Sequence, residues 1–136
     1  MIYGVGTDLI EIPRIERALA RFGERFAERI LCEPELRRFR AHTRPASYLA
    51  KRFAAKEAFT KALGTGIHAP ANWHGVWVSN QRSGKPQLEY SAALAELLEA
   101  RGIRRSHLTL TDERGMAAAT VILECDAEGR ACRWGR

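Results

Sequence analysis

The most extended hydrophobic pattern in the chain lies in residues 45–63, where apolar and small side chains recur with the period of a helix. Leu49 and Phe53 share one arc of this helix, and Glu57 and Lys61 continue the same arc toward its end. A proline opens the segment and a Gly-Thr-Gly sequence follows it, which are common start and stop signals. The pattern therefore predicts one long helix whose apolar stripe becomes charged in its last two turns.

Shorter patterns surround this helix on both sides. Helical spacing predicts further helices before it and one after it, and apolar residues that alternate with polar ones predict strands. Polar, glycine-containing turns follow two of the strands, at residues 81–85 and 112–115. The predicted helices are 10–22, 24–31, 33–39, 45–63 and 92–100, and the predicted strands are 2–8, 75–80, 86–90, 107–111 and 116–124.

These elements predict an α+β fold in which an antiparallel sheet packs around one long central helix. A chain of 136 residues can bury a sizeable core without disulfides or a structural metal. We expect one domain over residues 1–125. Residues 126–136 are polar and basic without periodicity, and we expect this tail to fray.

The charge of the chain narrows the choice of partners. The net charge is +6 and the pI is about 9.7, which favours nucleic acid, an acidic protein or a phosphorylated small molecule. The basic residues form no compact Lys/Arg block and do not alternate with stacking aromatics, so we expect no nucleic-acid partner. Arginines recur instead through residues 14–44, where a solvated helix face is the alternative to a docking surface.

Cysteine content and hydropathy bear on the compartment. The three cysteines include no C-x-x-C pair, which fits a reduced cytoplasmic setting better than a disulfide framework or a zinc site. The longest apolar runs fall short of the ~20 residues that span a bilayer. The first residues lack the pattern of a signal peptide. We therefore expect a cytoplasmic protein with no membrane partner.

Two carboxylates are the first candidates for chemistry. Asp8 follows a Gly-x-Gly-Thr run where an apolar strand ends, and Glu57 lies among apolar neighbours on the long helix. Each has a structural alternative, because Asp8 could cap the following helix and Glu57 could form a surface ion pair with Lys61. Together they would supply two hard oxygen ligands, which suits Mg²⁺.

Basic and polar groups near these carboxylates suit a phosphate ligand. Lys61 and the backbone N–H groups near Gly64-Thr65-Gly66 would receive phosphate oxygens. His107 heads the polar face of a strand, where a hydrogen-bonded structural role is the alternative. It is the only plausible imidazole base, because the other three histidines fall in loop-like stretches.

Four segments of the chain resemble the bacterial holo-acyl-carrier-protein synthases, the short single-domain class of 4′-phosphopantetheinyl transferases. The resemblance covers about residues 1–124, with the segments in the same order. The first two segments are the specific ones and the other two support them. The segments are GTDLIEIPRI (6–15), RFAAKEAFTKALGTGI (52–67), SGKPQL (83–88) and HLTLTDERGMAAATVILE (107–124).

The resemblance implies a Mg²⁺-dependent reaction that supports fatty acid biosynthesis. The enzyme would transfer 4′-phosphopantetheine from coenzyme A to a serine of apo-acyl carrier protein and release adenosine 3′,5′-bisphosphate. By motif, Asp8 and Glu57 would bind Mg²⁺, and Lys61 would sit on the coenzyme A phosphates and assist the leaving group. The base for the serine would be either a metal-associated water held by Glu57 and Asp8 or His107.

The resemblance also implies contacts with both substrates and with other copies of the chain. Arg14 is the first candidate for docking the acidic acyl carrier protein, with Arg21 and Arg25 next. Members of this class are typically homotrimers whose sites are shared between neighbouring subunits, and a run of three alanines at 117–119 is compatible with close packing. The further coenzyme A contacts implied are Arg52, Gly64, Thr65 and the turn formed by Gly84, Lys85 and Pro86.

Two other functions compete with the transferase. A small basic nucleic-acid-binding domain would explain the net charge but not the set formed by Asp8, Glu57 and Lys61. A metal-free protein that only recognises acyl carrier protein would tolerate Glu57→Gln, whereas the enzyme would not. Mg²⁺-dependent binding of coenzyme A would favour the transferase, and salt-sensitive nucleic-acid binding without Mg²⁺ would favour the first rival.

Overall fold

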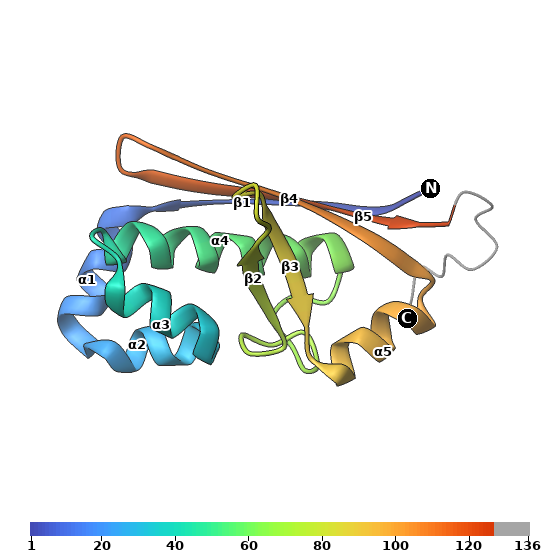
Figure 1. Cartoon of the computed structure of the whole chain (residues 1–136), viewed down its shortest axis with the longest axis horizontal. Coiled ribbons are helices and arrows are strands. Elements are labelled where there is room, and N and C mark those ends of the chain that lie inside the picture. The colour runs from blue at the N-terminus through green and yellow to red at the C-terminus, as the bar shows by residue number, and fades with distance from the viewer. Residues whose placement is uncertain (127–136) are drawn as a thin grey trace.

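A computed structural model describes residues 1–126 and has the expected α+β architecture (Figure 1). The tail predicted at 126–136 lies outside the described residues from position 127 onward. No helix among the described residues combines the length and apolar character that crossing a membrane requires. The elements in chain order are β1 (Ile2–Glu11), α1 (Ile12–Phe22), α2 (Glu24–Ile30), α3 (Glu33–Ala41), α4 (Pro45–Leu63), β2 (Val76–Asn80), β3 (Pro86–Tyr90), α5 (Ala92–Ala100), β4 (Ile103–Glu113) and β5 (Met116–Cys125).

The three long strands form an antiparallel sheet in the order β1-β5-β4, and β2 and β3 form a separate two-stranded sheet. Helix α4 runs along one face of the three-stranded sheet, with α1, α2 and α3 at one end of the molecule and α5 at the other (Figure 1). Helix α4 is therefore the central element, as its hydrophobic pattern predicts. Its buried side chains lie around most of its circumference and include Leu49, Ala54, Ala58, Phe59 and Leu63.

Most element boundaries agree with the sequence pattern, but two strands are longer than predicted. Strand β1 continues through Glu11, where the pattern predicts the start of a helix, because its pairing with β5 extends as far as Met116. Strand β4 begins at Ile103 rather than at residue 107, since it pairs with the full length of β5. The apolar strand β5 thus imposes strand structure on flanking segments whose own patterns are weak.

The turn between β4 and β5 is also tighter than predicted. Both strands continue to its edge, so that Glu113 pairs with Met116. The two residues between them, Arg114 and Gly115, both have left-handed backbone angles, with φ of 48° and 77°. This is the pattern of a two-residue hairpin turn whose twist matches that of the strands.

Candidate active site

The contact between β1 and α4 determines where the candidate site lies. A Cβ atom on Gly4 would come within 2.0 Å of the Ala62 carbonyl oxygen, and one on Gly6 within 1.9 Å of the Ala58 carbonyl oxygen. The Gly-x-Gly run of β1 therefore allows the helix backbone to rest directly on the strand. No phosphate need be invoked to explain these glycines.

Asp8 continues the same face of β1, because side chains two residues apart point to the same side of a strand. It meets Lys61 in the last turn of α4. The Lys61 ammonium donates to Asp8 Oδ1 at 3.1 Å and to the Thr7 carbonyl oxygen at 3.1 Å. The Asp8 side chain is 16% exposed and that of Lys61 is 53% exposed. Asp8 thus forms an ion pair rather than a helix cap, and α1 begins after Glu11 without a side-chain cap.

Glu57 lies one helical turn before Lys61 and completes the group that we call the Asp8–Glu57–Lys61 cluster. Partial burial raises the pKa of the Glu57 carboxyl above its usual range, and the nearby negative charge of Asp8 raises it further. Lys61 opposes this shift but does not cancel it. The fold therefore holds two carboxylates close enough to repel each other, an arrangement that a cation would relieve.

The donor set of the cluster fits Mg²⁺. Two carboxylates are the usual protein contribution to a Mg²⁺ site that takes its other ligands from water and substrate phosphates. Within residues 1–126, no group of three or more His, Cys, Asp or Glu side chains is placed to hold a metal. The described residues therefore do not form a metal site whose ligands all come from the protein. They agree with a site at Asp8 and Glu57 in which water and substrate phosphates supply the other ligands.

The glycines after α4 have a backbone reason for their presence. Gly64 ends the helix with φ of 87° and donates its N–H to the Thr60 carbonyl oxygen at 2.8 Å, and Gly66 has φ of 68°. Left-handed angles favour glycine. A Cβ atom on either glycine would meet no atom within 4 Å, so the space beside this turn is open. Thr65 lies between them, and its hydroxyl donates to the Gly66 carbonyl oxygen at 2.8 Å.

Arg52 occupies a different face of α4 from Glu57. It is 7% exposed, and its guanidinium lies 3.8 Å from the centroid of the Tyr48 ring. Burial lowers the pKa of Arg52 below its usual range. Its Nε is buried and finds no hydrogen-bond acceptor among the described residues. Arg52 is thus a buried cation with an unused donor, the kind of group that binds an anion.

His107 does not join the cluster within one chain. Asp8 pairs across the sheet with Ala119 and His107 with Ile122, three positions further along β5, so the two side chains point to opposite faces. His107 is exposed, and its Nε2 bonds to the carboxylate of Glu124 on β5. This hydrogen bond is the main reason why the pKa of Glu124 is lowered.

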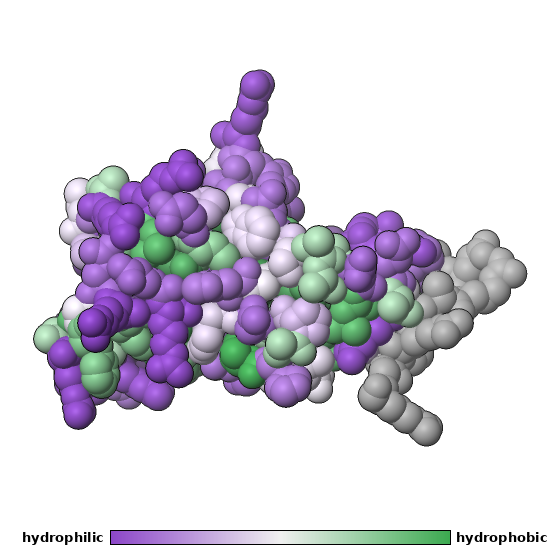
Figure 2. Space-filling model, turned by 90° about the horizontal axis from the view of Figure 1, so that it is seen from below, coloured by the Kyte–Doolittle hydropathy of each residue, from purple (hydrophilic) through white to green (hydrophobic). Residues whose placement is uncertain are grey.

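The remaining predicted residues lie on the surface. Lys85 and Pro86 are at the turn between β2 and β3, where the Gln81 N–H donates to the Lys85 carbonyl oxygen at 2.9 Å. Arg14 is exposed on α1. Arg21 and Arg25 line a groove of about 420 Å³ at the junction of α1 and α2, whose other lining residues are Phe22, Phe26 and Arg29. Figure 2 shows mostly hydrophilic side chains over this end of the molecule, with hydrophobic patches between them.

One ion pair near the cluster could not be predicted from the sequence. Lys56, the residue before Glu57, and Glu35 on α3 are both fully buried and lie 2.7 Å apart. The helical pattern gives no sign of this, because Lys56 and Glu57 are adjacent charges and either could face solvent. Only the packing of α3 against α4 determines that Lys56 is the fully buried one of the two.

Comparison with known proteins gives one consistent family. Residues 4–121 match the family described as the 4′-phosphopantetheinyl transferase superfamily. The chain is 49% identical to the holo-[acyl-carrier-protein] synthase of Nitrosomonas europaea over 124 residues, which cover 91% of this chain and 99% of that relative. It is 52% identical to the protein of the same name from Vibrio cholerae over 124 residues, which cover 91% of this chain and 98% of the relative.

Solved structures agree with this family. Holo-[acyl-carrier-protein] synthase from Neisseria meningitidis superposes with a TM-score of 0.89 at 45% identity and covers 91% of this chain and 99% of its own. The Bacillus anthracis enzyme in complex with coenzyme A (3′,5′-ADP) gives 0.77 at 37% identity, covering 93% and 99%. The Helicobacter pylori enzyme in complex with coenzyme A gives 0.78 at 28% identity, covering 88% and 99%.

Proposed function

The chain belongs to the 4′-phosphopantetheinyl transferase superfamily and, within it, to the holo-[acyl-carrier-protein] synthases, and on this premise we propose that it transfers 4′-phosphopantetheine from coenzyme A to a serine of apo-acyl carrier protein. The other product would be adenosine 3′,5′-bisphosphate. Relatives named for this reaction and relatives with bound coenzyme A support the proposal. The Asp8–Glu57–Lys61 cluster is the observation that carries it, because it joins a candidate metal site to a candidate phosphate-binding cation.

We propose that Asp8 and Glu57 hold Mg²⁺. The raised pKa of Glu57 supports this assignment, since a carboxylate that is partly buried and also repelled by its neighbour gains more from a cation than an isolated, solvated one does. A bound Mg²⁺ would neutralise charge on the coenzyme A pyrophosphate during the transfer. The chain's own part is to keep the two carboxylates together on the rigid contact between β1 and α4.

Lys61 is proposed to contact the same phosphates. Its ammonium is half exposed and lies beside Asp8, so a phosphate oxygen can approach it from solvent. A positive charge at this point would stabilise charge that develops on the transferred and leaving groups. We assign Lys61 the role of a catalytic residue for this reason.

The base for the serine hydroxyl has the same two candidates as before, a water held by Glu57 and Asp8 or His107. Since His107 lies on the sheet face opposite to Asp8, we assign it to the site of a neighbouring subunit in a homotrimer. The same sheet face supports assembly, because Val5 and Leu9 of β1 are 58% and 65% exposed there. Apolar side chains this exposed commonly mark an interface.

Coenzyme A would extend from the cluster over the residues that follow α4. The open space beside Gly64 and Gly66 leaves room for a ligand next to Thr65. The exposed ammonium of Lys85 would supply a cation for its phosphates, and Pro86 adjoins Lys85 at the turn. Arg52 is the remaining contact that the resemblance implies, and its burial on another face of α4 requires that a phosphate reach its unused donor from that side. These contacts follow the resemblance and remain proposals.

The acidic acyl carrier protein would dock on the end formed by α1 and α2. Arg14, Arg21 and Arg25 are exposed there, and the groove between the last two also presents the side chain of Phe22. Opposite charges would steer the carrier protein to this end, and the apolar side chains would stabilise the complex. A cytoplasmic location and a role in fatty acid biosynthesis complete the proposal.

Intact-mass spectrometry of an apo-acyl carrier protein tests this function. Incubation with the enzyme, coenzyme A and Mg²⁺ should add the mass of one phosphopantetheine group. The same carrier protein with its acceptor serine replaced by alanine should gain nothing. If the folded enzyme modifies none of several acyl carrier proteins, the transferase assignment fails and the basic-domain alternative should be tested with nucleic acid.

A further inference from the structure

Lys56, which precedes Glu57 on α4, and Glu35 form a buried ion pair in which every polar group has a partner. The Lys56 ammonium donates to the Ile30 carbonyl oxygen at 2.6 Å, to the Trp73 carbonyl oxygen at 2.7 Å and to Glu35 Oε1 at 2.7 Å. Three donated bonds use the full capacity of an ammonium group. The geometry of Lys56 is therefore fixed from three directions.

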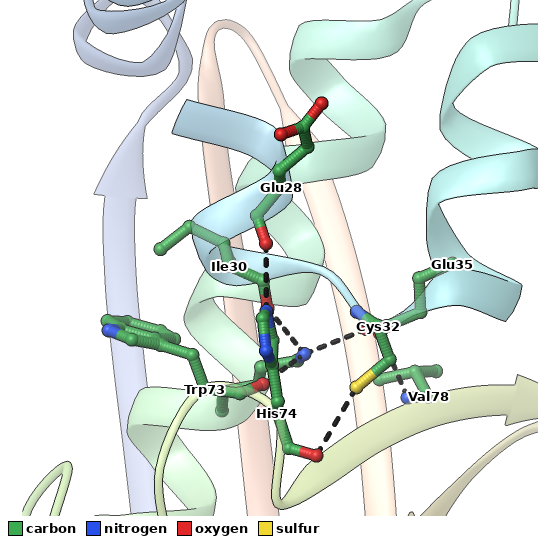
Figure 3. Close-up of polar contacts among 8 residues, drawn as sticks. Glu28, Ile30, Cys32, Glu35, Trp73, His74 and Val78 are labelled. Carbon is green, nitrogen blue, oxygen red and sulfur yellow. Dashed lines mark hydrogen bonds and ion pairs between the residues drawn. The ribbon is translucent and has the colours of Figure 1, made fainter. Parts of the chain in front are cut away.

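Glu35 extends the network to two more segments. Its Oε1 accepts the Cys32 N–H at 2.9 Å and its Oε2 accepts the Val78 N–H at 3.0 Å. The pair thus connects α4 to the end of α2, the start of α3, the segment between α4 and β2, and the middle of β2. Two further contacts join the same segments (Figure 3). The Cys32 thiol donates to the His74 carbonyl oxygen at 3.5 Å, and the His74 Nε2 lies 2.8 Å from the Glu28 carbonyl oxygen.

Stability alone is a poor explanation for this pair. Removing two charges from water is expensive, and apolar residues of similar volume often stabilise a core equally well. A buried pair of this kind does fix geometry, since its bonds are short and directional. The Lys56–Glu35 pair is therefore better explained by the part of the structure that it holds in place.

Lys56 directly precedes Glu57 on α4, so the pair holds the helix next to the candidate metal ligand. Consecutive residues on a helix point about 100° apart, so an anchored Lys56 sets the direction in which Glu57 leaves the helix. The opposite side of α4 rests on Gly4 and Gly6 without space for even a methyl group. Helix α4 is thus held between β1 on one side and the Lys56–Glu35 pair on the other, and it can neither turn nor slide freely.

We propose that Lys56 and Glu35 are positioning residues that set the distance between Glu57 and Asp8, and with it the affinity of the site for Mg²⁺ and coenzyme A. This inference rests on the proposed function. Without the pair, α4 can turn or shift on β1, and the two carboxylates no longer converge on one cation. Residues that orient metal ligands typically affect metal affinity or activity by about 10- to 100-fold.

The test compares variants that remain folded. Lys56→Met is combined with Glu35→Gln, so that neither buried charge is left alone. Glu35→Asp is the milder second variant, because it keeps the ion pair but shortens the side chain. Leu98→Ala, at a buried position on α5, is the control for destabilisation without a change near α4. Thermal unfolding is measured for each, and all assays are run well below the lowest melting temperature.

Calorimetric titration with coenzyme A over a range of Mg²⁺ concentrations gives a readout without turnover. We expect the Mg²⁺ concentration for half-maximal coenzyme A binding to rise at least tenfold in the double variant, at least threefold in Glu35→Asp and not at all in Leu98→Ala. Unchanged Mg²⁺ dependence in either folded pair variant would overturn the inference and leave the pair a structural role. Failure of the wild type to bind coenzyme A would contradict the proposed function instead.

Discussion

Glu57 lies in surroundings that disfavour its negative charge. The fold places its carboxyl partly out of water and close to that of Asp8, and the pKa of Glu57 is raised in consequence. The folded protein therefore holds a proton on Glu57 at pH values where the unfolded chain has lost it. The raised pKa of Glu57 therefore stabilises the folded state at low pH. This stabilisation is lost as the pH rises through the pKa that Glu57 has in the folded protein.

Replacement of Glu57 by Gln should accordingly stabilise the protein at neutral pH when no metal is added. We expect the melting temperature to rise by roughly 1–3 °C at pH 7.5, because the substitution removes a carboxylate that is partly buried and repelled by Asp8. Near pH 4 the two proteins should melt alike, since Glu57 is then protonated. Thermal unfolding in EDTA at both pH values checks this, and a Glu57→Gln protein that is less stable at pH 7.5 would contradict the assignment.

Lys61 should matter for the reaction through its charge. Lys61→Ala should lower kcat by about 100-fold, the usual effect of losing one group that stabilises transition-state charge. Lys61→Arg, which keeps a cation at this position, should retain more activity. Steady-state kinetics with coenzyme A and acyl carrier protein distinguish the two. Equal losses in both variants would point to the geometry of the ammonium rather than its charge.

The sequence predicts the cluster because its signals are local. Glu57 and Lys61 are one helical turn apart, and Asp8 ends a run that the glycines mark as unusual. The partners of Lys56 could not be predicted in this way, since they come from three segments that only the folded chain brings together. The opposite orientations of Asp8 and His107 likewise depend on strand register, which a single strand pattern does not give.

Among the elements, β1 and α4 depend on each other most closely. The helix backbone touches the strand at Gly4 and Gly6, and the site lies where this contact ends. The sequence predicts both elements but not their contact, because Gly-x-Gly is also compatible with a turn or a phosphate-binding loop. The parts of β1 and β4 that the sequence pattern does not predict as strand also depend on another element, since they become strands only by pairing with β5.

Gly6→Ala tests the contact. Its new methyl group would lie 1.9 Å from the Ala58 carbonyl oxygen, so α4 must move away from β1. We expect a loss of about 3 kcal/mol or more, at or above the upper end of typical overpacking costs. Gly23→Ala is the control, because its Cβ would meet no atom within 4 Å and only its backbone angles, φ of 67° and ψ of −156°, are unfavourable for alanine. That change should cost about 1–3 kcal/mol, less than the clash at Gly6. Urea unfolding measures both, and equal losses would refute steric contact as the cause.

At the scale of the whole molecule, the arginine-rich surface and the exposed apolar side chains of β1 lie in different places, although Phe22 is also exposed among the arginines. Exposed arginines follow α1, α2 and α3 at one end, whereas the exposed apolar residues of β1 lie on the outer sheet face. The net charge of +6 predicts an anionic partner from the sequence alone. The separation of the two surfaces requires the fold, because β1 and α1 are consecutive in the chain.

Charge reversal at Arg21 and Arg25 should weaken docking of the carrier protein. We expect the double substitution to Glu to raise KM for acyl carrier protein about tenfold, with kcat nearly unchanged, because these side chains lie away from the cluster. The difference should shrink at high salt, where exposed charges are screened. The control is the double variant Arg82→Glu/Arg104→Glu, which reverses the same number of charges at exposed positions outside α1 and α2. An equal effect there would show that only net charge matters.

The most direct test of the account is the metal dependence of transfer at Asp8 and Glu57. Intact masses of apo-acyl carrier protein are recorded after incubation with coenzyme A and the wild type, Asp8→Asn or Glu57→Gln, each with Mg²⁺ or with EDTA. The account predicts a phosphopantetheine mass gain only for the wild type with Mg²⁺, while both variants remain folded. A wild type that transfers equally well in EDTA, or a Glu57→Gln protein as active as the wild type, would contradict it.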